Sequence, residues 1–545
     1  MAMINDVVHE HSAYSVGCNG VLQYDFDREE SRGLGQRAAM KCEKCHYTSN
    51  RYTLYEIKQE PSRRGRDTVA MNEAVQIGLT QSRISNASLR LTMMSANIKP
   101  PSEKGMQTSA NKVCDQVELL NKMDMKKLRT RVKNINRFRG NPPEKVDLMM
   151  DGTYNNQLYS GYAQTPFQPA TQTMFTTAEH TTGSGYVIDL VTKNKLCNHI
   201  PPCENEHADK CKGNLPMASS IGNEQSYSEE SLTNLKEDNI EVDKLVTDSD
   251  TGAFKAAEKL HQQKKTVTKP THQLDPIHLN RNLRKNLSKC PKLEDIMPGE
   301  TKTARRNIKR RFTNDFAARC QAELTKLYEA HSGDIIPLKR AARDVRETIV
   351  KCYLGQHTAC RRKSGVCPGK KKKNWFTNNS YLPEDFKLKN GAIAKQILTD
   401  KVESRLGDTV LELTLYNIST QKVESVNKRL KRSLPSSVTY RRNFSGRANR
   451  AVYSVNHGPG TAVKELCEGI GCPIIPGTSV SKSLENEQMR YLYNKTYSKL
   501  DKVKLQKKRK RDKKYQMFDC KIDEEIYVKD RVMKEKGQRK SKTTD

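Results

Sequence analysis

Three β-rich runs that follow one another closely between residues 145 and 196 place the strongest constraint on the fold of this chain. They are KVDLMMDGTYNN (145–156), TQTMFTTAEH (171–180) and GYVIDLVTKNKL (185–196). Their apolar, β-branched and aromatic residues favour strands. Because the runs are consecutive and closely spaced, we expect three neighbouring strands that pair in an antiparallel manner.

A fourth strand and a helix complete this pattern. An acidic stretch rich in Ser and Asn, from Gly222 to Asp243, precedes the run DKLVTDSD (243–250), and the helical pattern TGAFKAAEKLHQQKK follows directly. The order of three strands, then a strand and a helix, is the one expected of an RNase H-like α/β core. We therefore expect the first part of such a core at residues 141–290.

Charged helical patterns follow this first part of the core. Residues 291–410 are interpreted as a helical insertion, and the last part of the core is expected at 411–460. There VESVNKRLKRSL (423–434) has the pattern of a helix with one acidic side chain among basic ones. Residues 461–545 are interpreted as a Gly/Pro-rich loop, a polar helix and a basic tail.

A small zinc-ribbon-like module is expected over residues 1–60. Cys42 and Cys45 form a CxxC motif between short β-like stretches, and two thiolates at this spacing can bind one zinc ion. Cys18 is the obvious third ligand. The candidates for the fourth ligand are His9, His11 and His46.

Residues 61–140 have a helical pattern. Apolar residues recur there at three- and four-residue spacing, with basic residues on the opposite side and a break at Pro100 and Pro101. One interpretation is a helical domain that packs against the rest of the protein. The other is a helix-turn-helix that contacts DNA.

The charge of the chain points to a polyanionic partner. Lys and Arg outnumber Asp and Glu by 96 to 63, which gives a formal net charge of +33. Basic runs recur at Arg305–Arg311, Lys370–Lys373 and Lys507–Lys514. A protein that neutralises phosphates with Lys and Arg releases counterions, so this distribution favours nucleic acid over a solvated basic tail alone.

The distribution of apolar residues excludes a membrane-spanning protein. No run approaches the roughly 18 apolar residues of a spanning helix, and the N-terminus lacks the pattern of a secretory signal. The run at 507–514 is interpreted as a helical nuclear import signal or a phosphate-binding arm, although many such runs are simply solvated helix faces.

Two aspartates follow apolar strands and are candidate metal ligands. Asp151 follows VDLMM and Asp248 follows KLVT, so on neighbouring strands they would converge at one edge of the sheet. Glu424, on the later helix, could close the site. Three such carboxylates suit two Mg²⁺ ions (or Mn²⁺) that act in phosphodiester cleavage. From the pattern alone, an Asp in such a position is more often a turn or N-cap residue than a metal ligand.

Four short segments resemble one family in sequence and in order. DGTYN, VTDSDTGAF, DPIHLNRNLRKNL and VESVNKRLKRSLP occur here as they do in Mutator-like transposases, and the resemblance extends over most of the chain. It is closest to the stand-alone Mutator-like domains of invertebrate genomes. GVLQYDFDREESRGLGQRAAMKCEKC is similar to the zinc-ribbon region of that group. GIGCPIIPGTSV, the polar helix and the basic tail are similar to its C-terminal end.

The resemblance implies a role for each matching position. Asp151, Asp248 and Glu424 match the catalytic carboxylates of a DDE transposase, with Asp250 as the alternative to Asp248. Asp275 and His278 match the family's C/D-x2-H element, in which His278 would hold a DNA strand or place a flipped base. The basic residues assigned to DNA contact are Arg284, Lys285, Arg429, Lys507, Lys508, Arg509, Lys510 and Arg511.

Two further groups of Cys and His have ligand types that suit structural zinc. One consists of Cys197, Cys203, His207 and Cys211, with His199 inside the same segment. The other consists of Cys352, His357, Cys360 and Cys367. No SWIM-type zinc knuckle follows Glu424, which leaves recognition of transposon ends to the N-terminal modules.

The leading hypothesis is a nuclear DDE transposase. It would bind terminal inverted repeats and target DNA, work as a homo-oligomer that synapses two ends, and catalyse metal-dependent strand cleavage and transfer. A domesticated transposase that binds DNA without cutting it is the alternative. An unrelated zinc-containing chromatin or RNA-binding protein would not account for the order of the four segments.

Overall fold

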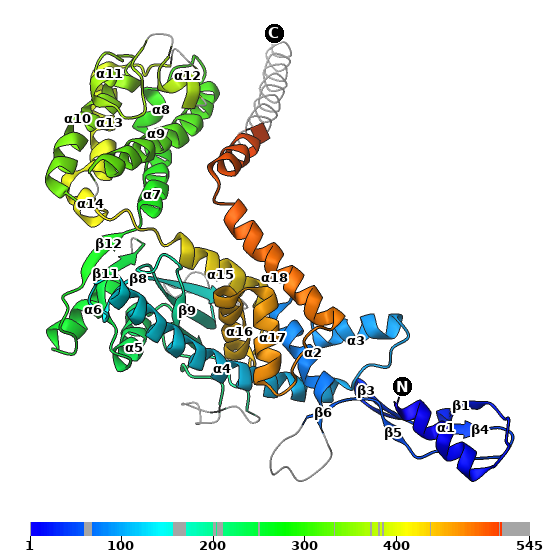
Figure 1. Cartoon of the computed structure of the whole chain (residues 1–545). Helices are drawn as coiled ribbons and strands as arrows, with labels where there is room; N and C mark the ends of the chain where they lie inside the picture. The colour runs from blue at the N-terminus through cyan, green and yellow to red at the C-terminus, as the bar shows by residue number, and fades with distance from the viewer. Residues whose placement is uncertain are drawn as a thin grey trace, which may run out of the picture. The chain divides into compact units, whose positions relative to one another are not determined.

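The computed structural model divides into two compact units. The first comprises Met1–Thr271 and Thr420–Met489, and the second comprises His272–Ser419 and Arg490–Asp545 (Figure 1). None of the helices in the described residues is long and apolar enough to cross a bilayer. The residues described are 2–58, 68–155, 170–199, 203, 211–248, 251–331, 333–370, 373–379, 382–383, 386–436, 438–511 and 513–514.

A mixed sheet organises the first unit. In the described part of the chain its strand order is β10-β9-β8-β11-β12. β8, β9 and β10 are antiparallel neighbours, whereas β11 runs parallel to β8. These strands confirm the four predicted from the sequence, and β12 follows them where the chain passes into the second unit. Their bounds are β8 Lys145–Asn155, β9 Gln172–Glu179, β10 Val187–Asn194, β11 Glu241–Thr247 and β12 Thr271–Leu274.

Helices cover both faces of this sheet (Figure 1). Val146, Leu148 and Met150 of β8 point to one face, where they join a hydrophobic cluster. The residues between them point to the other face, because side chains alternate along a strand. The helices of the first face are α4 (Glu103–Phe138), α5 (Glu224–Glu237) and α6 (Gly252–Gln262), and α15 (Gln421–Ser433) packs on the second face.

The helix α5 was not predicted. The stretch from Gly222 to Asp243 looks like a polar connection because Ser, Asn and Glu dominate it, yet it forms a helix that begins at Glu224. Asn223 caps this helix by accepting a hydrogen bond from the Ser226 amide. Tyr227, Leu232 and Leu235 are buried against the sheet, and they carry the apolar periodicity that the polar composition hides.

The helical pattern over 61–140 is confirmed for the described residues and corresponds to α2 (Ala70–Gln81), α3 (Asn86–Ser95) and α4. α2 and the first half of α4 pack with α16 (Phe444–His457) and α17 (Pro459–Gly469), while the second half of α4 packs on the sheet. The loop expected from about residue 460 is therefore wrong for its first part. α17 occupies that position, with Pro459 in its first turn and Leu466 buried.

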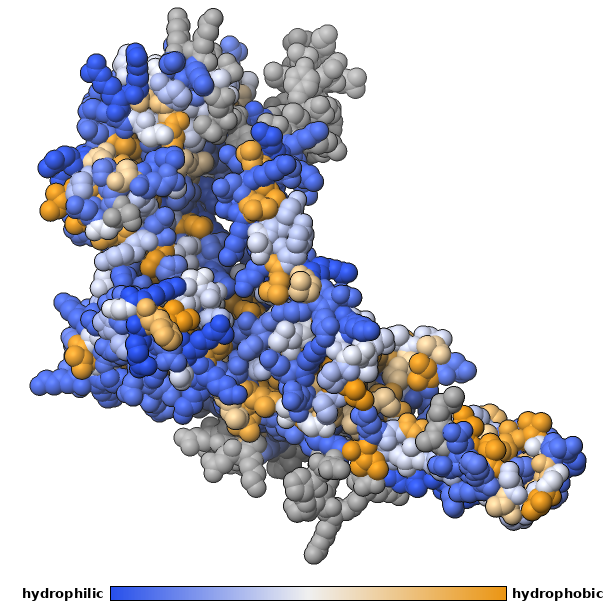
Figure 2. Space-filling model, viewed as in Figure 1, coloured by the Kyte–Doolittle hydropathy of each residue, from blue (hydrophilic) through white to orange (hydrophobic). Residues whose placement is uncertain are grey.

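The N-terminal module combines a helix with short strands. Its helix is α1 (Ala2–Tyr14), which the sequence did not predict. Figure 2 shows hydrophobic side chains on the surface of this module, in contrast to the mostly hydrophilic surface elsewhere in that view. Val16, Val21 and Phe26 are among its exposed apolar residues. The strands are β1 Leu22–Tyr24, β2 Glu30–Arg32, β3 Gly35–Ala38, β4 Met40–Cys42, β5 Tyr52–Thr53, β6 Ile57–Lys58 and β7 Thr68–Val69.

The second unit is helical, as predicted for residues 291–410. An aromatic cluster that includes Phe312, Phe316 and Tyr353 lies at its centre. α18 (Ser479–Tyr497) begins in the first unit and ends in the second, and residues 501–511 of the second unit are also helical. The helices of residues 272–419 are α7 Pro276–Lys289, α8 Lys292–Asp295, α9 Lys302–His331, α10 Ile335–Tyr353, α11 Cys360–Lys363, α12 Trp375–Asn379, α13 Gly391–Leu406 and α14 Asp408–Leu413. α7 was expected within the first part of the core, but it belongs to the second unit.

Candidate functional site

The register of β8 and β11 relates the positions of two aspartates. Leu245 is level with Leu148, and Val246 is level with Met149 in this parallel pair. β11 ends at Thr247, and the same register continued by two residues would bring Asp248 level with Asp151. Side chains two residues apart on a strand point to the same face, so Asp151 lies on the face that carries α15, and an extended chain would direct Asp248 to it as well.

α15 is joined to the first of these aspartates by a hydrogen bond. Asn427 donates from Nδ2 to Oδ2 of Asp151 at 2.8 Å. Thr176, which is level with Asp151 on β9, donates to Oδ1 of the same Asn427 at 3.4 Å. Asn427 is therefore a buried residue that fixes the helix to two strands, and the sequence analysis missed it.

Glu424 lies one turn before Asn427 on the same side of α15. Positions three apart on a helix share a face, so the bond from Asn427 to Asp151 brings Glu424 to the same part of the sheet. Its side chain is 14% exposed, and Lys428 lies 3.8 Å from Oε2. Asp151 and Asp248 are also partly exposed, which leaves room for a substrate.

The donor set of this site fits magnesium. Carboxylate oxygens are the ligands that Mg²⁺ takes from proteins, and these come from two adjacent strands and the helix packed on them. Asp151 and Glu424 would hold the ions, with Asp248 next to Asp151. Asp250, the alternative to Asp248, lies outside the described residues.

Asp275 and His278 belong to the second unit. Asp275 is fully buried and caps α7, since its Oδ1 accepts a hydrogen bond from the Ile277 amide at 2.7 Å. Ser419 donates to the other carboxylate oxygen at 3.2 Å. His278 contacts Arg281 at 3.1 Å through Nε2. Asp275 therefore has a structural role at the start of α7, and His278 is the more accessible of these two residues.

The N-terminal cysteines form a cluster with one histidine. His11, Cys18, Cys42 and Cys45 bring one ligand atom each to within 4.8 Å of one another. Of the three candidates for the fourth ligand, His11 is the one the structure places there. It comes from α1, so the expected β ribbon receives a ligand from a helix that precedes it.

The geometry of this cluster fits zinc. Sγ of Cys18 lies 3.8 Å from Sγ of Cys42, which matches the separation of about 3.8 Å between two thiolates 2.3 Å from a tetrahedral zinc ion. A hydrogen bond from the Cys45 backbone amide lowers the pKa of the Cys42 thiol to about 6, so the ligand form is favoured. Gly20 packs so closely that a Cβ there would lie 2.5 Å from Sγ of Cys42.

A second cluster of the same type lies in the second unit. Cys352, His357, Cys360 and Cys367 also approach within 4.8 Å of one another, with Nδ1 of His357 3.4 Å from Sγ of Cys352. Hydrogen bonds from Cys352 and Cys360 lower the pKa of Cys367. The loop that carries Cys367 is anchored at Ser364 and Gly365, which both donate to the buried carboxylate of Glu323.

The third cluster follows β10. Cys197, Cys203 and Cys211 are neighbours, with Cys197 Sγ 3.5 Å from both other sulfurs. Nδ1 of His199 lies 3.6 Å from Sγ of Cys203, while His207 lies outside the described residues. The amides of Cys203 and His199 donate to Cys197, and the first of these contributes most to a thiol pKa of about 6.

The basic residues assigned to DNA contact lie on helices. Arg284 and Lys285 are exposed on α7, and Arg429 is half-buried on α15. The run from Lys507 to Arg511 is helical and exposed. Such positions are accessible to a phosphate backbone, and their role remains a prediction.

Comparison with known proteins identifies the family. A family model described as Mutator-like transposase matches residues 1–367, which include Asp151 and Asp248 but end before Glu424. A search among curated proteins gives no match. Because the family model covers more than half of the sequence, the chain belongs to the Mutator-like transposase family.

Proposed function

We propose that this protein is a DDE transposase that cuts and joins DNA at the terminal inverted repeats of a transposon, with Asp151, Asp248 and Glu424 as catalytic residues. The observation that carries the proposal is the register of β8 and β11, which, continued by two residues, would bring Asp248 level with Asp151 under the helix of Glu424. Family membership supports the same activity. The strand order, with β11 parallel to β8, supports an RNase H-like core.

Two Mg²⁺ or Mn²⁺ ions, when bound, would stabilise the attacking and leaving oxygens of an in-line displacement. Asp151 and Glu424 hold ligand oxygens in place, and Asp248 contributes from the adjacent strand. Asn427 would restrain rotation of the Asp151 carboxylate, because its amide donates to one of the two carboxylate oxygens. Lys428 partly offsets the local negative charge before the substrate arrives.

The remaining parts of the proposal concern partners and location. The basic helices would contact transposon and target DNA, and a homo-oligomer would bring two ends together. The N-terminal zinc module and the helices that follow would recognise the ends. The relationship to invertebrate stand-alone Mutator-like domains and a nuclear location belong to the same proposal.

A nicking assay tests the catalytic assignment. The substrate is a labelled duplex that carries one terminal inverted repeat and its flank, with added Mg²⁺ or Mn²⁺. Asp151→Asn, Asp248→Asn and Glu424→Gln are each expected to abolish cutting and to leave DNA binding largely unchanged.

Asp147→Asn is the matched control for these variants. Asp147 lies on the same face of β8 as Asp151, but it pairs with Lys244 at 3.1 Å. This variant should cut like the wild type. Cutting at the wild-type rate by Asp151→Asn or Glu424→Gln would show that the assignment is wrong, and a wild type that binds ends but never cuts them would indicate a DNA-binding protein without catalysis.

A further inference from the structure

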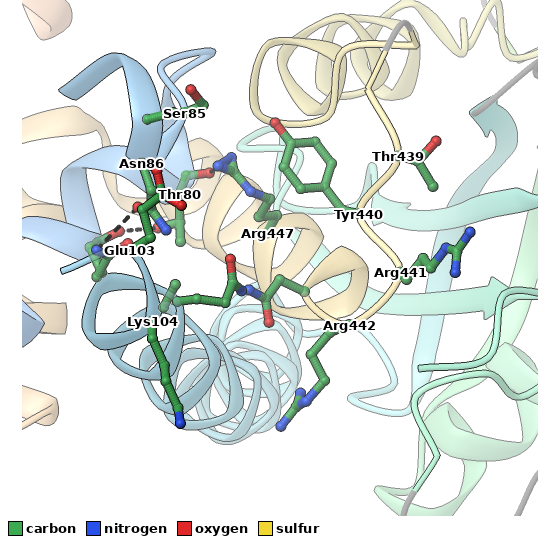
Figure 3. Close-up of a pocket in the computed structure, with 15 residues that line it drawn as sticks. Thr80, Ser85, Asn86, Glu103, Lys104, Thr439, Tyr440, Arg441, Arg442 and Arg447 are labelled. Atoms are coloured by element: carbon green, nitrogen blue, oxygen red, sulfur yellow. Dashed lines mark hydrogen bonds between the residues drawn. The ribbon is translucent and has the colours of Figure 1, made fainter. Parts of the chain in front are cut away.

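A polar groove lies in the first unit between the N-terminal helices and the segment 439–443 (Figure 3). Its volume is about 750 Å³, within the range of sites that hold small molecules or single nucleotides. It is lined by α2, α3 and α4 on one side and by the start of α16 on the other. Neither Asp151 nor any Cys of the three clusters lines it.

The N-termini of helices converge on this groove. Ser85 and Asn86 begin α3, Lys104 lies in the first turn of α4, and Asn443 is the N-cap of α16. The first amides of a helix carry partial positive charge and attract anions. For α16, no side chain caps these amides, since Asn443 makes no capping hydrogen bond.

Asn443 supplies an independent sign of a ligand. The residue is 8% exposed, and its Oδ1 is buried without a hydrogen-bond partner among the described residues. A buried polar atom of this kind normally has a partner, because leaving it without one is unfavourable. A side-chain amide can bond both donors and acceptors, as it does when it meets the edge of a nucleobase.

The charged residues of the groove favour a phosphate. Among its described lining residues, four are cationic and one, Glu103, is acidic. Glu103 is already paired with Arg90 at 2.6 Å. Lys104 and Arg441 are exposed and make no ion pair in the described part of the chain. Figure 3 shows both side chains pointing outward, away from Tyr440 and Arg447, so they would meet a phosphate at the edge of the groove.

The other two cations build the wall of the groove. Arg447 donates to the carbonyls of Leu79, Thr80 and Ser433, and its guanidinium lies 4.2 Å from the ring centre of Tyr440. Arg442 makes a bidentate ion pair with Asp115. These bonds hold the groove in shape before a ligand binds, which lowers the entropy lost on binding.

The segment 439–443 is also tied to the catalytic sheet. Gln172 of β9 donates to the Tyr440 carbonyl at 3.1 Å, and Asn194 of β10 donates to the Arg441 carbonyl at 2.9 Å. Gln172 is level with Asn155, four residues beyond Asp151 on β8. At about 3.3 Å per strand residue, this anchor lies roughly 13 Å from Asp151, a distance of a few nucleotides along a DNA strand.

We propose that this groove holds one nucleotide of the DNA strand a few positions from the cut. Its phosphate would lie against Lys104, Arg441 and the helix N-termini, and its base would bond Asn443. The proposal rests on the proposed function, since it assumes that DNA is the substrate. It adds a position-specific contact that is separate from the metal-binding carboxylates.

The first test measures the phosphate contact. Binding of the labelled terminal-repeat duplex is followed by anisotropy at a series of salt concentrations, with full-length Asp151→Asn protein as the uncut reference. Adding Lys104→Ala or Arg441→Ala should reduce the magnitude of the slope of log affinity against log salt by about 1. The same variants should reduce the affinity at 0.1 M salt roughly eightfold. Lys127→Ala, an exposed cation on the same helix α4 but outside the groove, should change affinity less than twofold.

The second test locates the base contact. Single abasic sites are placed at successive positions of the flank. The reference protein should bind the duplex more weakly when the abasic site is at one particular position. The Asn443→Ala variant should bind that duplex and the intact duplex equally well, and its melting temperature should equal that of the reference protein. Asn443→Asp keeps the size of the side chain but replaces its amide by a carboxylate, and it should also lose the sensitivity to the abasic site, which separates the base contact from a folding defect.

The outcomes distinguish this proposal from the catalytic one. If the groove variants bind and cut DNA like the wild type, or if Lys127→Ala weakens binding as much as they do, the groove proposal is wrong and the transposase proposal stands. If free deoxynucleoside monophosphate binds the groove while DNA affinity is insensitive to the variants, the groove is a small-molecule site and not a DNA contact. A wild type that neither binds nor cuts DNA would overturn the proposed function itself.

Discussion

The buried ion pair of Glu73 gives a sharp test of how the N-terminal module is joined to the helices. Oε2 of Glu73 lies 2.6 Å from Nζ of Lys58, and the two side chains are only 4% and 6% exposed. Lys112 of α4 pairs with the other carboxylate oxygen at 2.6 Å. One carboxylate on α2 therefore neutralises a buried cation from β6 and a partly exposed one from α4.

Glu73→Gln removes the negative charge that pairs with the buried Lys58. Breaking a buried pair in this way costs about 3–5 kcal/mol. A surface pair such as Glu118 with Lys122 contributes about 0–1 kcal/mol, so Glu118→Gln is the matched control. The double variant Lys58→Met with Glu73→Leu should recover much of the lost stability, because apolar side chains can replace a buried ion pair.

Urea unfolding with two probes measures this difference. The chain has one tryptophan, Trp375, which is buried in the second unit, so its fluorescence reports that unit alone. Circular dichroism reports both units. Glu73→Gln should move the transition of the first unit to lower urea and leave the fluorescence midpoint in place. A change under 1 kcal/mol in the first unit, or an equal shift of both probes, would refute the argument.

The remaining predictions address the sites. Asn427→Ala should slow cutting roughly 10- to 100-fold at unchanged DNA affinity, since a hydrogen bond to a charged group contributes about 1.5–3 kcal/mol; unchanged single-turnover rates would contradict this. Asp248→Asn should abolish cutting, and Asp250→Asn should have a milder effect. The reverse order in the nicking assay would assign the role of the second catalytic aspartate to Asp250. Purified protein should contain three zinc ions by metal analysis, and Cys42→Ser should contain one fewer and bind ends poorly. Burial alone would lower the pKa of His457, but the carboxylates of Asp124 and Glu465 outweigh it and raise the pKa. The stability that protonated His457 gains from these carboxylates is therefore complete below the unfolded pKa of about 6.5 and is lost as pH rises through the folded pKa. His457→Gln should remove this pH dependence from unfolding midpoints measured between pH 6 and 8.

The sequence predicted the strands well because their apolar runs are short and bounded by turn residues. It also predicted correctly that Asp248 directly follows a strand, whereas Asp151, expected at a strand end, lies inside β8, which continues to Asn155. It did not reveal Asn427, because an Asn in a basic helix carries no signal until the helix is seen on the sheet. Asn427 is set by contacts with β8 and β9, which lie more than 240 residues earlier in the chain.

The other features that the sequence analysis missed have identifiable causes. α5 is masked by its polar composition, and α1 is a short helix without a strong apolar stripe. α17 begins with Pro459 and Gly460, which favour a loop, although its apolar residues are buried on one face. His11 is one of three candidate histidines, with His9 and His46, and its place on α1 beside the cysteines identifies it only in the structure. The groove around Asn443 depends on helices from both ends of the first unit, which no local pattern can bring together.

The path of the chain through the two units has a consequence for synthesis. Residues 272–419 are made after β11 and before α15, so a nascent chain carries both strand aspartates well before it carries Glu424. At ribosomal speed this interval lasts on the order of ten seconds. During it, the sheet face that α15 covers stays open and the third carboxylate is absent. A chain that stops early would thus have the proposed DNA-binding modules without the third proposed catalytic carboxylate, and its uncovered sheet face would favour aggregation or chaperone binding.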